Sequence, residues 1–553
     1  MIRIFAILIG LFFAMQGVAH AKWHKAESDH FVIYADDSEE DVRRFAEMLE
    51  QYHASMELVT GRKVDKPSPS NRVTIFAVGS QRDIRRLAGT DSRSLAGFYV
   101  PRAGGSKAFV QDIRLKNGYP DFSTVILLHE YAHHFLISTS RFAMPRWMSE
   151  GAAEFFAAAS FNRDGSVQIG RPAQHRANEL AYADEVSIYH LLDQELYNQE
   201  RGKRYDAFYG RSWLLYHFLN FDGERKGQLP AYWQKVAGGA ASIDAAREVF
   251  GDLDQLEKDL DRYLRQRRML NYKIERELLS YGEVTVTRLS EGEAEMIPVR
   301  MRSQRGVDAE TAAEVVVDAR KIAEEFPDDP GVLTALAEAE YDAGNDEKAI
   351  AAATAAIARD PNRANAYVQH GYALFRRAED ADDQEAAYKA AMVPFLALNK
   401  IENDHPIPLI HFYRSYVQRG EEPNEQAKFA LERAAVLAPF DQSRWFNVAM
   451  MQAGEGKIAI ARQSLTPIAN DPHGGSRSRA AKVLLTAMAD AEEGKPFYVA
   501  QTLDTEDDQT GDQTGDSADD DTSEDETPES DHAPDGKDAD AESETRLLLA
   551  RFG

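Results

Sequence analysis

The stretch Leu127-Leu128-His129-Glu130-Tyr131-Ala132-His133-His134-Phe135 decides how this chain is interpreted. Its apolar flank predicts a buried helix, and the spacing of four residues places His129 and His133 on one side of that helix. Two imidazoles in this arrangement can reach one metal ion, and Glu130 lies between them in sequence, offset around the helix. The stretch therefore predicts a metal site on a helix inside a folded domain.

A second stretch, Pro145-Arg146-Trp147-Met148-Ser149-Glu150-Gly151-Ala152-Ala153-Glu154-Phe155-Phe156, follows after a short gap. Catalytic zinc takes three protein ligands and keeps one position open. The chain has no cysteine, which excludes disulfides and thiolate ligands, so the third ligand must be His, Asp or Glu. Glu150 follows His133 by 17 residues and can reach the site from a second helix. Glu154 lies one helical turn further on, where it can accept a hydrogen bond from the other nitrogen of a ligand imidazole.

Together the two stretches, HExxH followed by W-x-x-E-G-x-A-E, resemble the gluzincin clan of zinc metallopeptidases. More narrowly, the chain resembles exported bacterial proteins that join a peptidase-MA-like domain to tetratricopeptide (TPR) repeats. The resemblance covers roughly residues 28–270. It implies one zinc ion per chain held by His129, His133 and Glu150, with Glu130 as the general base. It also implies that Glu154 is the carboxylate behind a ligand imidazole.

Two further expectations come from the same resemblance. The strand that contains Ala108, Phe109 and Val110 would be the sheet edge against which an extended peptide substrate lies. Tyr209, in the stretch Tyr209-Gly210-Arg211-Ser212, resembles a tyrosine that donates to the oxyanion in related enzymes. A tyrosine here can equally cap a core helix, so both interpretations stay open.

The pattern around these stretches is typical of an α+β fold. Strand-like runs at 30–34, 72–78, 98–100 and 108–111 alternate with helical spacing, and almost everything from 123 to 272 is helix-like. We therefore expect a gluzincin-like domain over residues 22–280, with a small mixed sheet and a helical subdomain. Residues 281–305 contain two strand-like runs around Glu291-Gly292-Glu293, which predicts a β-hairpin at a domain junction.

Residues 306–495 carry an internal repeat. Pro327 and Pro361 are 34 residues apart, as are Ala337 and Gly371. A period of 34 residues is typical of TPR helix pairs, in which small residues let the helices approach and proline ends the second helix. The alternative is coincidental spacing in an alanine-rich sequence. The repeat predicts an all-α TPR solenoid after the first domain.

The two ends of the chain differ from the rest. Residues 1–21 predict a signal peptide, because Arg3 and a short apolar run precede Ala19-His20-Ala21. Residues 496–545 form an acidic tail too polar to fold, so we expect disorder there. Residues 546–553 are a short apolar C-terminal segment, for which a docking motif and a terminus without a role are the two alternatives.

Charge and hydropathy limit the possible partners. The net charge is −27, and the stretch from Asp504 to Glu544 has 19 acidic residues against one lysine, so the folded part is only mildly acidic. This balance argues against nucleic-acid binding. No stretch after the signal is long and apolar enough to span a membrane. We expect an exported protein, most simply in a bacterial periplasm.

These features predict an exported zinc metallopeptidase that hydrolyses peptide bonds with a zinc-activated water and Glu130 as the base. The TPR array would bind the peptide or protein substrate, or a partner protein. The alternative is a non-catalytic scaffold or assembly protein of the cell envelope that uses the TPR groove. Because Glu130 and all three expected ligands are present, the sequence favours the enzyme.

Overall fold

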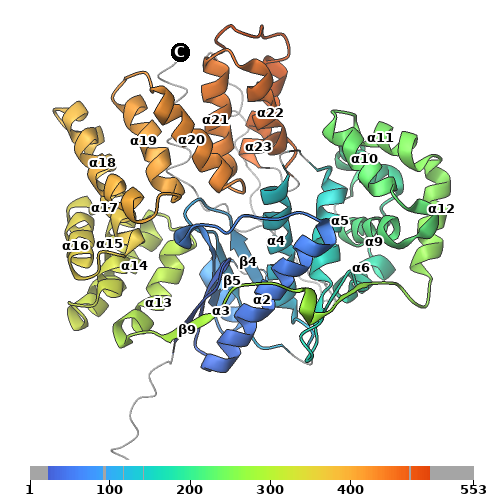
Figure 1. The fold of residues 1–553 in the computed structure, drawn as a ribbon, viewed down its shortest axis with the longest axis horizontal. Coiled ribbons are helices and arrows are strands. Elements are labelled where there is room, and N and C mark those ends of the chain that lie inside the picture. Colours follow the sequence, from blue (N-terminus) through green and yellow to red (C-terminus); the bar gives the residue numbers. More distant parts are fainter. Residues whose placement is uncertain are drawn as a thin grey trace, which may run out of the picture.

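The computed structural model describes residues 23–498 except 91, 93–94, 116–117, 141, 143, 203 and 472–474. A six-stranded sheet lies centrally, with a helical subdomain on one side and an array of helices curving around the other (Figure 1). The predicted signal peptide (1–21), the apolar C-terminal segment (546–553) and all but the first residues of the acidic tail lie outside the described residues. Within the described part, no helix has both the length and the apolar character needed to cross a membrane.

The central sheet has the strand order β4-β5-β3-β2-β1-β9. Strands β2, β3 and β5 run parallel, whereas β1 is antiparallel to β2, β9 to β1 and β4 to β5. The predicted small mixed sheet is therefore confirmed. The strands are β1 (His24–Glu27), β2 (Phe31–Ala35), β3 (Val73–Ala77), β4 (Gly97–Val100), β5 (Lys107–Val110) and β9 (Thr285–Arg288).

Helices cover both faces of this sheet. On one face, Phe31 and Ile33 pack against α2 (Glu39–Thr60) and α4 (Phe122–Thr139). On the other face, Tyr34 and Phe76 pack with α3 (Gln81–Ala88) and α13 (Glu291–Gln304). Because both faces are buried, β2 and β3 are apolar at nearly every position instead of alternating.

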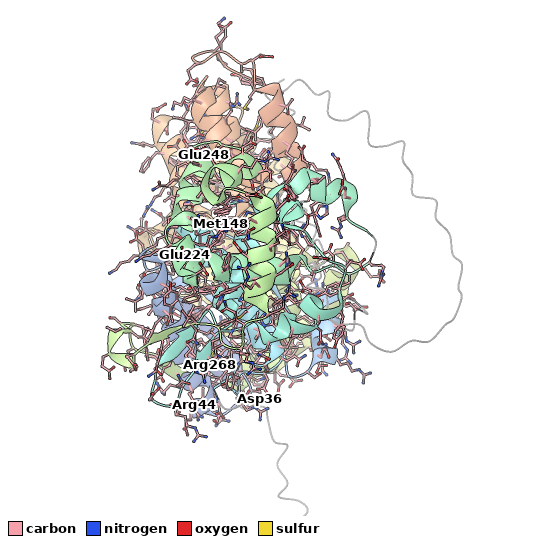
Figure 2. The ribbon with its side chains drawn as sticks, turned by 90° about the vertical axis from the view of Figure 1, so that its right-hand side faces the viewer. Asp36, Arg44, Met148, Glu224, Glu248 and Arg268 are labelled. Atoms are coloured by element: carbon pink, nitrogen blue, oxygen red, sulfur yellow. The ribbon has the colours of Figure 1, made fainter. Side chains whose placement is uncertain are left out.

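The helical subdomain follows α4, and Figure 2 shows it from the side, with the array behind it. Its centre is the packing of α5 (Arg146–Ala157) against α9 (Phe208–Phe221). A three-stranded sheet, β6-β7-β8, interrupts the helical region that the sequence predicts. The other elements are β6 (Ser160–Phe161), β7 (Val167–Ile169), α6 (Ala177–Tyr182), α7 (Ile188–Leu192), α8 (Gln194–Glu200), α10 (Gln228–Ala237), α11 (Ser242–Phe250), α12 (Leu253–Leu264) and β8 (Tyr272–Ile274).

The predicted β-hairpin at 281–305 is wrong. Only its first half is a strand, β9, which pairs with β1 at the other end of the domain. The second half is helix α13, whose first turn is capped by Ser290: its Oγ accepts from the backbone N–H of Glu293 at 3.1 Å. Helix α13 lies between two layers: Ile297 faces the sheet, and Val299 faces the next helix pair. Because the helix is buried on two sides, its sequence has a continuous apolar run, which resembles that of a strand.

The helical repeat is confirmed. Helices α15 and α17 begin 34 residues apart, and consecutive helices pack as antiparallel pairs (Figure 1). The array begins earlier than residue 306, because α13 and α14 already form a pair. Its helices are α13, α14 (Ala309–Glu325), α15 (Pro330–Asp342), α16 (Asp346–Arg359), α17 (Ala364–Glu379), α18 (Gln384–Ile401), α19 (Pro406–Gln418), α20 (Glu425–Leu437), α21 (Gln442–Gly454), α22 (Ile458–Ala469) and α23 (Ser476–Ala487).

The array contacts the sheet domain of its own chain. The side chain of Asn71 donates to the carbonyl of Leu437 at 2.7 Å, and the backbone N–H of Ala103 donates to Asp441 at 3.0 Å. The ring of Phe440 stacks on His134 of α4, with centroids 4.2 Å apart. The turn between β4 and β5 thus packs against the inner side of the array.

Candidate metal centre

Helix α4 carries the two histidines of the first stretch. Asp121 caps its start, because the Asp121 carboxylate accepts from the N–H of Thr124 at 2.8 Å. One turn apart, His129 and His133 are 7% and 6% exposed, and their Nε2 atoms lie 3.0 Å apart. Two ring nitrogens so close in a buried site are suited to a shared metal ion.

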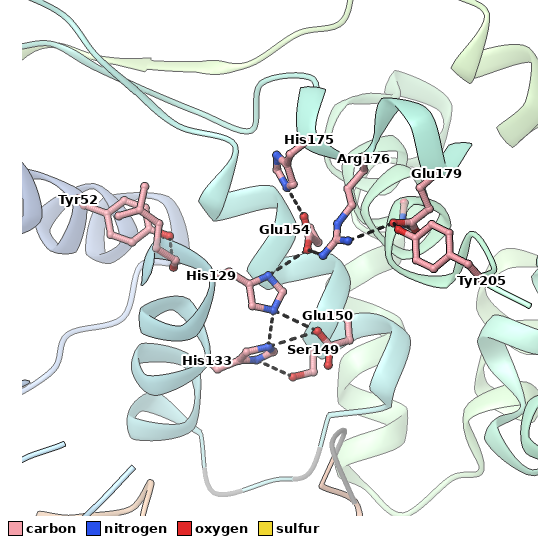
Figure 3. A network of polar contacts seen from close by, with 12 residues as sticks. Tyr52, His129, His133, Ser149, Glu150, Glu154, His175, Arg176, Glu179 and Tyr205 are labelled. Carbon is pink, nitrogen blue, oxygen red and sulfur yellow. Dashed lines mark hydrogen bonds and ion pairs between the residues drawn. The ribbon is translucent and has the colours of Figure 1, made fainter. Parts of the chain in front are cut away.

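Helix α5 brings the third expected ligand. Trp147 anchors it, since the buried indole N–H donates to Tyr232 at 2.9 Å. Glu150 is fully buried, and its Oε2 lies 3.3 Å from Nε2 of both His129 and His133 (Figure 3). The structure thus brings together the three residues that the sequence nominates from two separate stretches.

The geometry of this group fits zinc. Ligand atoms bound at about 2.0–2.1 Å to a tetrahedral zinc lie roughly 3.3 Å from one another. The three atoms here are separated by 3.0, 3.3 and 3.3 Å. Two imidazoles and one carboxylate are also a donor set that catalytic zinc uses. His129, His133 and Glu150 could therefore hold the ion without rearrangement.

Glu154 lies behind this group. Its Oε1 is 3.1 Å from Nδ1 of His129 and 2.6 Å from the Arg176 guanidinium, and His175 contacts its other oxygen at 2.5 Å (Figure 3). Burial acts to raise the pKa of Glu154, but Arg176, His175 and His129 outweigh it and hold the pKa well below its ordinary value. Glu154 is therefore an anion that orients His129.

The same charges act on His129. Burial acts to lower the pKa of His129, but the carboxylates of Glu154 and Glu150 outweigh burial and raise the pKa to about 10. On the second imidazole, Nδ1 of His133 lies 3.3 Å from the Ser149 hydroxyl. Each of the two imidazoles thus has a polar partner at Nδ1, the arrangement that is typical of metal-binding histidines.

The sequence did not reveal the residues that support Glu154. His175 and Arg176 come from a short 3-10 turn, Gln174–Arg176, 21 and 22 residues further along the chain. Arg176 also pairs with Glu179 at 3.1 Å, and Tyr205 donates to Glu179 at 2.8 Å. No local spacing predicts these contacts, because they depend on how the loop after β7 folds over α5.

Glu130 and Tyr209 lie beside the three-residue group. Glu130 is half-buried on α4. Burial raises the pKa of Tyr99 on β4, and the negative charge of Glu130 adds to this effect. The ring of Tyr209 lies 6.5 Å from the ring of His129, and the Arg176 guanidinium is 4.7 Å from the Tyr209 ring centre. Tyr209 is therefore near the candidate metal centre, in the first turn of α9.

The prediction that Ala108, Phe109 and Val110 form the sheet edge is wrong. These residues belong to β5, which has β3 on one side and β4 on the other. Both rows of backbone groups of β5 are thus used within the sheet. The turn at 101–106 folds the chain back, so β4 is the edge strand on this side.

One other group of carboxylates could hold a cation among the described residues, namely Glu185, Glu257 and Asp261. Arg211 forms ion pairs with both Glu257 and Asp261. The three residues are half-buried or exposed, and Arg211 already pairs with two of the three carboxylates, so the group is an ion-pair cluster near the surface.

Comparisons with known proteins add little to this geometry. No protein-family model and no curated protein matches the sequence. Among solved structures, TTC0263, a thermophilic TPR protein of Thermus thermophilus, is 18% identical, with a TM-score of 0.27 over 32% of this chain and 91% of that one. MamA is 17% identical, with a TM-score of 0.25 over 31% of this chain and 92% of that one.

Proposed function

We propose that this chain is a zinc-dependent peptidase of the gluzincin type, exported to the periplasm. The observation that carries the proposal is the convergence of His129, His133 and Glu150 at zinc-ligand spacing, with Glu154 holding the first imidazole. Zinc at this position would polarise a substrate carbonyl and lower the pKa of a bound water.

The residues of the chain have separate roles in this proposal. Glu130, next in sequence to His129, takes a proton from the attacking water and passes it to the leaving amine. The Tyr209 hydroxyl donates a hydrogen bond to the carbonyl oxygen as negative charge develops on it. Glu154 keeps Nδ1 of His129 protonated, so that Nε2 is available as a ligand.

The test combines metal analysis with substrate profiling. The mature protein and its Glu130→Gln variant are analysed for zinc and incubated with a peptide library, with cleavage read by mass spectrometry. We expect one zinc per chain in both proteins and cleavage lowered about 100- to 10,000-fold in the variant. Bound zinc without cleavage of any peptide by the wild type would contradict the proposal.

A second candidate function is that of a scaffold that binds a partner protein. Large apolar side chains are exposed on outer helices of the array: Val393 and Leu396 on α18 are 63% and 52% exposed, and Phe429 on α20 is 66% exposed. Exposed apolar residues of this size are typical of interaction surfaces when they cluster. A scaffold needs no general base, so full rescue of a deletion strain by Glu130→Gln would favour this function over peptidase activity.

A further inference from the structure

Arg146 is a charged residue next to the candidate metal centre that the proposed mechanism does not use. It begins α5 four residues before Glu150, so both side chains project from the same side of the helix. The residue is half-buried. Burial acts to lower the pKa of Arg146, but Tyr209 and Glu150 outweigh it and raise the pKa, so the guanidinium is charged.

Aromatic rings hold the plane of this guanidinium. Its Cζ lies 4.4 Å from the ring centre of Phe208 and 5.5 Å from that of Tyr197. Stacking uses the flat faces of a guanidinium and leaves its N–H groups, which point outward in the plane, available for hydrogen bonds. The ring contacts thus fix the plane of Arg146 without using its donors, and a side-chain hydrogen bond with Tyr209 uses part of its donor capacity.

Other buried arginines of the domain are neutralised. Arg176 pairs with Glu154 and Glu179, and Arg211 pairs with Glu257 and Asp261. Arg146, by contrast, forms no ion pair with a carboxylate in the described part of the chain. Its buried Nε–H has no acceptor there, which is also true of the Nε–H of Arg176 and of Arg211. Buried donors without acceptors are costly, and a planar row of N–H donors matches the two oxygens of a carboxylate.

We propose that Arg146 binds a carboxylate of the substrate beside the metal centre and so makes the enzyme selective for peptides that carry one near the cleaved bond. The inference rests on the proposed peptidase function. The carboxylate has two possible sources, the free C-terminus of a short peptide or the side chain of an Asp or Glu residue. Arg146 is in this scheme a specificity residue, distinct from Glu130 and the ligands.

The first experiment measures kcat and KM on matched peptides. One pair differs only by a free or amidated C-terminus, and a second pair differs only by Asp or Asn next to the cleaved bond. In the wild type we expect one of the two carboxylates to raise kcat/KM by roughly 10- to 100-fold over its neutral partner. Arg146→Gln should abolish that preference, and Arg146→Lys should restore only part of it, because lysine lacks the paired donors.

The control is Arg201→Gln. Arg201 also stacks on Tyr197, at 5.6 Å, but it is exposed and follows α8. This variant should keep the wild-type preference. An equal preference for carboxylate in Arg146→Gln and the wild type, or a wild type that cleaves all four peptides alike, would overturn the inference.

A binding experiment separates this inference from the proposed function. Calorimetry with the zinc-loaded Glu130→Gln protein compares an N-acetyl dipeptide acid with its amide, and an Asp-containing amide with its Asn analogue. The inference is supported if either acid binds more tightly than its neutral analogue and if this preference disappears in the Glu130→Gln, Arg146→Gln double variant. This outcome would count even if no peptide is cleaved. Cleavage without any role of Arg146 in either experiment leaves the peptidase proposal standing and refutes the inference.

Discussion

Three ionisable side chains, His129, His175 and Arg176, meet the carboxylate of Glu154, which is 1% exposed. A buried carboxylate is stable only when such partners offset its loss of hydration. The cluster therefore has two consequences at the residue scale. It keeps Glu154 ionised, and it fixes the ring of His129 with Nε2 toward Glu150 and His133.

This role of Glu154 predicts the effect of Glu154→Gln. The amide keeps the size of the side chain but loses the negative charge of the carboxylate, which accepts hydrogen bonds from His129 and Arg176. We expect zinc affinity, measured by competition with a chelator, to fall about 10- to 100-fold. Glu248→Gln is the matched control, because Glu248 is exposed on α11 and pairs only with Lys235 among the described residues. Equal zinc affinity in Glu154→Gln and the wild type would contradict the assigned role.

A second prediction at this scale concerns His217 and pH. Its fully buried ring has Nε2 3.0 Å from the carbonyl of Gly170 and Nδ1 2.9 Å from the hydroxyl of Tyr263, an arrangement that suits the neutral imidazole. Burial lowers the pKa of His217 to about 4. As pH falls below about 6.5, the unfolded chain takes up this proton first, so stability is lost between pH 6.5 and 4, by up to about 3 kcal/mol.

Urea unfolding between pH 7.5 and 5 measures this effect. His217→Gln has no group that titrates in this range at that position, so its free energy of unfolding should depend less on pH than that of the wild type. The remaining dependence reports other buried histidines, such as His405, whose pKa burial also lowers to about 4. Parallel curves for variant and wild type would show that His217 does not contribute.

At the scale of elements, the candidate metal centre depends on how closely α5 approaches α9. A Cβ on Gly151 would lie 2.4 Å from the carbonyl oxygen of Ser212, closer than atoms can approach. Glycine therefore lets α5, with Glu150, lie directly against the helix that carries Tyr209. The position that looks like part of a ligand motif is in fact a helix-packing position.

Gly151→Ala should force the two helices apart. We expect a loss of about 1–3 kcal/mol in the free energy of unfolding, measured by urea denaturation, because backbone atoms cannot yield as a flexible side chain can. Gly223→Ala is the control, since nothing lies within 4 Å of a Cβ there and its φ is not left-handed. A variant at Gly151 as stable as the control would contradict the close approach of α5 and α9.

At the scale of the whole molecule, the array and the sheet domain are joined by polar contacts between distant parts of the chain. Ser70 donates to Glu402 through its N–H at 2.9 Å and its hydroxyl at 2.8 Å. Asn71, 3% exposed, donates to Leu437 and accepts from the N–H of Gly104 at 3.1 Å. Because Asn71 bridges the β4–β5 turn and the array, it is central to this interface.

Asn71→Ala should loosen the interface without unfolding either part. Loss of both bonds leaves the half-buried N–H of Gly104 and the half-buried carbonyl of Leu437 without these partners, at a local cost of about 1 kcal/mol. We expect faster hydrogen exchange at residues 101–106 and 437–441, measured by mass spectrometry. Asn470→Ala is the control, because among the described residues its exposed side-chain amide donates only to the carbonyl of Thr466 in the preceding helix, α22. Unchanged exchange in Asn71→Ala would contradict this view of the interface.

The sequence by itself determined the features that depend on local spacing. His129 and His133 share a helix face because four residues make about one turn, and the 34-residue period defines helix pairs because each pair repeats one local unit. Tertiary structure alone decided which distant segments meet: β9 with β1, β4 at the sheet edge, and Arg176 behind Glu154. These contacts depend on which surfaces are buried together, and no short-range pattern in the chain records that choice.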